Sequence, residues 1–108
     1  ELPYDVEEII KENLEIENEF VKDIVFGVET SINEIDSIAN KYLKDWDIKR
    51  LDKARSAILR MAIYEMKYMH TPPVVVINEA IELAKKYTDE DLVSMINAVL
   101  DKFMKDEL

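Results

Sequence analysis

Glycine and proline are nearly absent from this chain, and their scarcity limits its possible folds more than any other feature. The 108 residues include one glycine, Gly27, and three prolines, Pro3, Pro72 and Pro73. Hairpin turns and phosphate-binding loops depend on these residues, because glycine tolerates a positive φ and proline fixes a turn. Apolar residues instead recur at helical spacing. The sequence therefore predicts an all-α protein, a compact bundle of four to five helices in a single domain covering residues 1–108.

Composition excludes several classes of function. The chain has no cysteine and one histidine, His70, so it lacks the ligands of thiolate zinc sites and of di-iron sites with paired Glu-x-x-His motifs. We expect no metal, no cofactor and no catalytic residue. No apolar run approaches the roughly 20 residues that span a bilayer, and the acidic opening is not typical of a targeting peptide. A soluble, cytoplasmic protein without a membrane partner is expected, and the C-terminal KDEL is interpreted as a charged helix end.

The charge balance is strongly acidic. Fourteen Lys and Arg stand against 24 Asp and Glu, which gives a formal net charge of −10. Phosphate binding is driven largely by Lys and Arg, so this balance argues against nucleic acid as a ligand of the whole surface. Any contact with RNA has to be local.

The first half of the chain predicts a short helix and a long one. Apolar spacing indicates a helix over residues 5–14 and a single long helix over residues 17–44, with a kink near Gly27 or Asn33 as the alternative. Gly27 lies at the edge of the apolar stripe, so we expect it to permit a close approach of another helix. Phe26 falls on the opposite face, where it is either simply exposed or covered by a further helix or partner.

Three more helical regions are expected in the second half. Trp46 is predicted to pin a turn to the core, ahead of a central helix over residues 51–69. Pro72 and Pro73 end that helix and begin the next, so the run VVVI is predicted to be helical despite its strand propensity. A near capping box from Thr88 to Asp91 opens the last helix. The polar sector of the central helix is predicted to consist of Lys53, Ser56, Arg60 and Lys67.

Glu65 stands in the apolar stripe of the central helix. A carboxylate there has to be paired or hydrogen-bonded, or its pKa rises. Arg50, Arg55 and Arg60 are the candidate partners for an internal pair, and contact with another protein is the alternative. Catalysis is the least favoured interpretation, because no base or nucleophile is placed against it.

The last 60 residues carry a more specific pattern. It consists of Trp46, Arg50 with Leu51, ILRMAIYE at 58–65, Pro72, VINEAIELAKKY at 76–87 and INAVLDKF at 96–103. In this combination and spacing the chain resembles the NusB family of bacterial transcription antitermination factors. The resemblance implies a non-catalytic protein that pairs with NusE, binds boxA RNA of nascent ribosomal transcripts and acts in an RNA polymerase antitermination complex.

The resemblance also implies where RNA is bound. In the family, RNA binding relies on an arginine-rich N-terminal segment and a first helix, which would precede Glu1, so we expect this chain to be N-terminally incomplete relative to the family. At the start of the last helix the family favours Asp-Ser-x-Lys-Phe-Val-Asn-Gly. Asp91 and Asn97 match that pattern, whereas Ser94 and Met95 replace its basic and aromatic residues and weaken the expected RNA contact. The residues expected to contact RNA are Lys85, Asp91, Ser94, Met95 and Asn97.

The partner surface is expected on the hairpin formed by residues 51–87. Its candidate contact residues for NusE are Arg60, Glu65, Asn78, Glu79 and Glu82. Two alternatives to antitermination stay open: a NusB-like domain of a ribosomal RNA methyltransferase, and a protein-binding helical module without boxA recognition. The sequence does not determine the oligomeric state.

Overall fold

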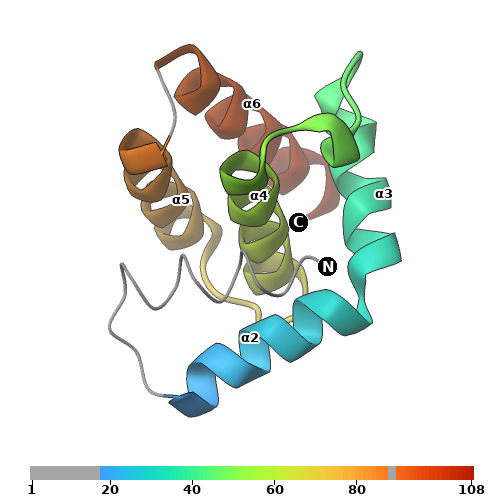
Figure 1. Ribbon diagram of the computed structural model, residues 1–108, viewed down its shortest axis with the longest axis vertical. Coiled ribbons are helices and arrows are strands. Elements are labelled where there is room, and N and C mark those ends of the chain that lie inside the picture. Colours follow the sequence, from blue (N-terminus) through green and yellow to red (C-terminus); the bar gives the residue numbers. More distant parts are fainter. Residues whose placement is uncertain (1–17, 88–89) are drawn as a thin grey trace.

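A computed structural model describes residues 18–87 and 90–108, and these residues form helices and their connections (Figure 1). The expected helix at 5–14 and the capping residue Thr88 lie outside the described residues. The elements are α2 (Asn18–Thr30), α3 (Ile32–Leu43), the 3-10 helix η1 (Ile48–Arg50), α4 (Lys53–Lys67), α5 (Pro73–Tyr87) and α6 (Glu90–Glu107). The all-α prediction is confirmed.

The prediction of one long helix over residues 17–44 is wrong, and the break lies at Ser31, between the two positions of the alternative kink, Gly27 and Asn33. The chain turns at Ser31, whose φ of −106° and ψ of 19° leave the helical range, so α2 and α3 run in different directions (Figure 1). A straight helix of that length would be roughly 40 Å long, whereas the longest extent of the molecule is 35 Å. The turn lets Ile24 and Val28 of α2 and Ile35 of α3 all enter one core, where each is at most 2% exposed.

Helix α4 lies at the centre and contacts α2, α3, α5 and α6 (Figure 1). It begins at Asp52, whose carboxylate accepts a hydrogen bond from the Arg55 backbone N–H at 2.8 Å. Because helices surround α4, part of its predicted polar sector is wrong: Ser56 is 6% exposed and Arg60 is 9% exposed. Arg60 is tolerated there because its guanidinium binds both carboxylate oxygens of Asp36 on α3, at 2.7 and 2.9 Å.

The proline pair sets the next boundary as predicted. Helix α5 starts at Pro73, where the missing N–H leaves no unsatisfied donor, and the Val76 N–H already donates to the Pro72 carbonyl at 3.1 Å. The run VVVI is therefore helical. Val76 is 1% exposed, whereas Val74 and Val75 are 64% and 46% exposed. Helices α5 and α6 pack against each other and against α4.

The expected close approach at Gly27 is also confirmed. A Cβ atom built on Gly27 would overlap Cζ and Oη of Tyr64, so the Tyr64 ring occupies the space a side chain would take. That ring in turn stacks on Tyr68, with centroids 5.3 Å apart. Gly27 thus allows α2 to cross α4 closely.

Replacing Gly27 with alanine is expected to cost about 1 kcal/mol of unfolding free energy, since overpacking of about 1–3 kcal/mol outweighs the gain of about 1 kcal/mol in helix propensity. In a chain that already carries Tyr64→Ala, the obstacle is gone and the same replacement should stabilise. Urea denaturation of the four chains in this double-mutant cycle measures both effects. A loss of the same size in both backgrounds would contradict the contact.

Candidate nucleic-acid and partner interface

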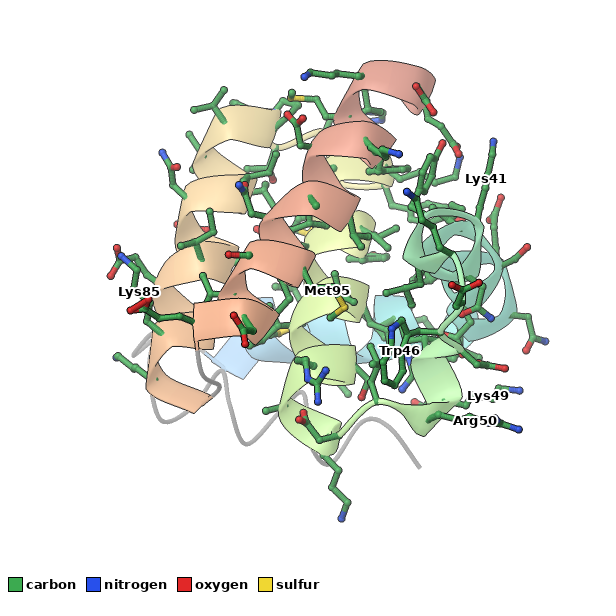
Figure 2. The ribbon with its side chains drawn as sticks, turned by 90° about the horizontal axis from the view of Figure 1, so that it is seen from above. Lys41, Trp46, Lys49, Arg50, Lys85 and Met95 are labelled. Carbon is green, nitrogen blue, oxygen red and sulfur yellow. The ribbon has the colours of Figure 1, made fainter. Side chains whose placement is uncertain are left out.

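Most of the residues expected to contact RNA gather where α5 ends and α6 begins. Lys85 is exposed near the end of α5, and its Nζ lies 3.7 Å from a carboxylate oxygen of Glu82. Asp91 and Ser94 are exposed in the first turns of α6, and Met95 is half-buried against the core. Figure 2 shows Lys85 and Met95 on the same end of the molecule. Asn97 is exposed further along α6.

The residues expected to contact a partner divide between surface and interior. Asn78, Glu79 and Glu82 are exposed on α5, and Glu65 is half-buried on the adjacent part of α4. Arg60 differs from these, because it is buried and both oxygens of Asp36 hold its guanidinium. The structure therefore brings Glu65 and Glu79 together between α4 and α5, leaves Asn78 and Glu82 on the exposed surface of α5, and uses Arg60 to tie α3 to α4 instead.

Glu65 lies at the rim of a small, largely apolar hollow between α4 and α5. The hollow is lined by Ile58, Met61, Ala62, Glu65, Val76, Glu79, Ala80 and Leu83. Burial, with a smaller contribution from the nearby negative charge of Glu79, raises the pKa of Glu65 to about 7. The predicted arginine partners are wrong: Arg60 binds Asp36, and Arg55 binds Asp52 at 2.9 Å. Arg50 ends η1, before the N-terminal end of α4, whereas Glu65 lies near the C-terminal end of that helix.

Because of Glu65, we expect the protein to lose stability as the pH rises from about 4.5 to about 7. The pKa of this carboxyl is 4.5 in the unfolded chain and about 7 in the folded one, so the folded state binds the proton more tightly. Its contribution is complete below pH 4.5 and is lost as the pH rises through 7. With partial solvent exposure taken into account, the loss is about 1–2 kcal/mol.

Urea midpoints measured across this pH range test that expectation in the wild-type chain and in Glu65→Gln. The amide mimics the protonated form, so this variant should show a flatter pH dependence. Glu82→Gln is the matched control, because the Glu82 side chain is 75% exposed, and it should keep the wild-type slope. Equal slopes in all three chains would contradict the assignment.

Sequence patterning missed the exposure of Trp46. The prediction that Trp46 pins its turn to the core is wrong, because the side chain is 57% exposed and the anchors are Ile48 and Leu51, at 0% and 8%. Exposed Lys49 and Arg50 project outward from the same turn as Trp46, on the end of the molecule that also carries Met95 (Figure 2). The available signal was the charge pattern: residues 41–55 contain six of the fourteen Lys and Arg and only three acids.

No group of three or more His, Cys, Asp or Glu side chains within residues 18–87 and 90–108 could hold a metal ion. None of the helices found in that part of the chain is long and apolar enough to cross a membrane.

The helices and their packing define an all-α protein with the NusB fold. T. maritima NusB superposes on this chain with a TM-score of 0.80, covering 97% of this chain and 89% of that one at 24% sequence identity. A chain of the structure described as "Crystal Structure of a Plectonemic RNA Supercoil" superposes with a TM-score of 0.77, covering 91% of this chain and 74% of that one at 34% identity.

Sequence comparison identifies the family. Residues 4–105 match the model of the NusB family, and the chain belongs to that family. It is 47% identical over 92 residues to the transcription antitermination protein NusB of Pediococcus pentosaceus, covering 84% of this chain and 69% of that protein. The Thermoanaerobacter sp. protein of the same name is 41% identical, with 84% and 65% covered. The chain thus spans about two thirds of the length of these relatives, which support a role in transcription antitermination.

Proposed function

We propose that this chain is the helical scaffold of a non-catalytic antitermination factor that pairs with NusE and binds boxA RNA in the RNA polymerase antitermination complex of the cytoplasm. The observation that carries the proposal is 47% identity over 84% of the chain to a transcription antitermination protein. The RNA supercoil structure also contains a chain of this fold at 34% identity. Residues 1–108 act as a single domain in this proposal.

In this proposal the two partners use separate surfaces. Lys85, Asp91 and Ser94 lie at the end where α5 meets α6, whereas Glu65 and Glu79 lie between α4 and α5. A protein partner on the α4–α5 face therefore leaves the start of α6 open to RNA. The acidic α4–α5 face favours a partner with a basic contact surface.

RNA affinity depends on basic residues added to this scaffold. The chain has a net charge of −10, and the start of α6 carries Ser94 and Met95 instead of the basic and aromatic residues of the family pattern. We expect weak boxA binding by the chain alone and binding at least tenfold tighter after fusion of a basic N-terminal segment from a NusB relative.

Fluorescence anisotropy with boxA and scrambled RNA at physiological salt tests this proposal. The matched control is the same fusion with its arginines replaced by glutamine, which keeps the length and removes the charge. Equal boxA affinity with and without the basic segment would contradict its role. Equal affinity of the basic fusion for boxA and scrambled RNA would contradict boxA recognition.

The partner surface has its own test. Glu79→Lys combined with Glu82→Lys reverses two exposed charges on α5 and should abolish co-elution with NusE. Asp106→Lys and Lys105→Glu change exposed charges on α6 and should leave co-elution intact. Unchanged NusE binding by the α5 variant would show that the partner binds elsewhere.

The acidic charge and the presence of Ser94 also favour a second candidate, a NusB-like interaction module without boxA binding. A ribosomal RNA methyltransferase domain is one setting for such a module. NusE-independent, sequence-independent binding by the basic fusion would support this candidate over an antitermination factor.

A further inference from the structure

The α3–α4 turn and the helix ends that flank it carry more basic than acidic residues, unlike the chain as a whole. Residues 41–55 carry a formal charge of +3, against −10 for the whole chain. Two of their three acids are engaged in capping: Asp47 accepts from the Lys49 N–H at 2.9 Å, and Asp52 accepts from the Arg55 N–H at 2.8 Å. Within the described part of the chain, no acidic side chain forms a salt bridge with the exposed Lys49 or Arg50, although the hydrogen bond from the Lys49 N–H and, to a smaller extent, the charges of both residues lower the pKa of the neighbouring Asp47.

Trp46 projects from this turn, and hydrogen bonds and a buried side chain anchor the backbone around it. The Trp46 N–H donates to the Leu43 carbonyl at 3.3 Å, and the Ile48 N–H donates to Oδ1 of Asn40 at 2.7 Å. Ile48 is fully buried, so the backbone is anchored directly after Trp46. The indole nevertheless remains 57% exposed. Burying an indole would contribute substantially to stability, so an anchored turn that leaves it in solvent presents a ready contact surface.

We propose that Trp46, Lys49 and Arg50 form a base-stacking contact for single-stranded RNA. The exposed indole offers a flat face to an unpaired base, and the two cations that project from the same turn match the phosphates further along the strand. A duplex fits less well, because its base faces are already stacked. This inference rests on the proposed function, since it names a further contact for the RNA.

The position of the turn supports this assignment. Trp46 lies on the same end of the molecule as Met95, with Lys49 and Arg50 beyond it and Lys85 on the other side (Figure 2). In Figure 1 the α3–α4 turn and the start of α6 occupy the same end of the bundle. A strand that crosses the start of α6 can therefore continue over Trp46. Met95 on α6 has no aromatic ring on which a base could stack, and the Trp46 indole on the α3–α4 turn supplies one instead.

The chain offers a direct optical test, because Trp46 is its only tryptophan. Its emission should be quenched when a 12-nucleotide single-stranded RNA is titrated into the full chain, alone and in complex with NusE. Both boxA and an unrelated single strand are used, since stacking tolerates any base. A duplex of the same length should quench little.

Affinity measurements on variants complete the test. Trp46→Ala should weaken single-strand binding about tenfold, and Trp46→Phe should restore most of the affinity. Lys49→Gln with Arg50→Gln should reduce the slope of log affinity against log salt concentration by the amount expected for the loss of about two phosphate contacts. Phe26→Ala is the matched control, because Phe26 is 70% exposed on α2, and its affinity should equal that of the wild type. An unchanged melting temperature of each variant checks that it is folded.

The outcomes separate this inference from the proposed function. Tight boxA binding without quenching and with full affinity in Trp46→Ala would overturn the Trp46 contact and leave the proposed function standing. Quenching by both single strands with equal affinity would support the contact and contradict boxA recognition. Quenching by NusE in the absence of RNA, with weaker NusE binding in Trp46→Ala, would overturn the inference by showing that the turn contacts a protein.

Discussion

Replacing Arg60 with alanine is expected to lower the free energy of unfolding by about 3–5 kcal/mol, because it leaves the Asp36 carboxylate buried without a partner. Asp36 is 6% exposed and Arg60 is 9% exposed, and two hydrogen bonds of 2.7 and 2.9 Å join them. Asp36→Ala should cost a similar amount, since it strands the guanidinium instead. Urea denaturation at neutral pH gives both values.

The Asp36→Leu, Arg60→Met double variant distinguishes the lost pair from the stranded charge. Apolar side chains of similar volume in place of both partners are often neutral or stabilising, so the double variant should be far more stable than either alanine variant. The exposed pair of Lys105 with Asp101 provides the control: Lys105→Ala should cost less than about 1 kcal/mol. A loss below 1 kcal/mol for Arg60→Ala would contradict the assigned pair.

Phe103→Ala is the second substitution with a large expected effect, about 3–5 kcal/mol, because it opens a cavity in the core. Phe103 is fully buried on α6, and its ring meets that of Tyr42 on α3 edge to face, with centroids 6.3 Å apart. The lost ring contact adds to the lost apolar burial. Denaturation midpoints with an unchanged m value would report this loss as stability alone.

Phe26→Ala is the matched control for Phe103→Ala, because it removes the same side chain from a position that is 70% exposed. Phe26→Ala should change the free energy of unfolding by no more than about 0.5 kcal/mol. Similar losses for Phe26→Ala and Phe103→Ala would mean that the two phenylalanines are equally buried, contrary to the structure.

Much of the fold could be predicted because its signals are local. Apolar residues every three or four positions reflect the helical repeat itself, and Pro72 with Pro73 marks a boundary wherever the helices pack. Gly27 could be interpreted correctly because only a missing side chain lets another element come that close. The sequence also indicated that Glu65 needs a partner or a raised pKa, and the pKa is indeed raised, to about 7.

The same patterns failed where a residue's surroundings come from distant parts of the chain. Arg60 was expected on the polar sector of the central helix and as a candidate partner of Glu65, but its pairing with Asp36, 24 residues away, depends on how α3 lies on α4. Trp46 was expected inside because large aromatic residues usually are, but Ile48 and Leu51 fill that part of the core. Helical periodicity ran through Ser31 without a break, although the chain turns there.

The sequence by itself determined that this chain is helical, where α5 begins, that Gly27 marks a close approach, and that the chain resembles the NusB family. Each depends on backbone geometry or on motifs within a short stretch. The tertiary structure decided the turn at Ser31, the buried pair of Asp36 with Arg60, the position of Glu65 near Glu79, and the exposure of Trp46. These features arise only when helices pack, because packing determines which charges meet and which apolar side chains leave the solvent.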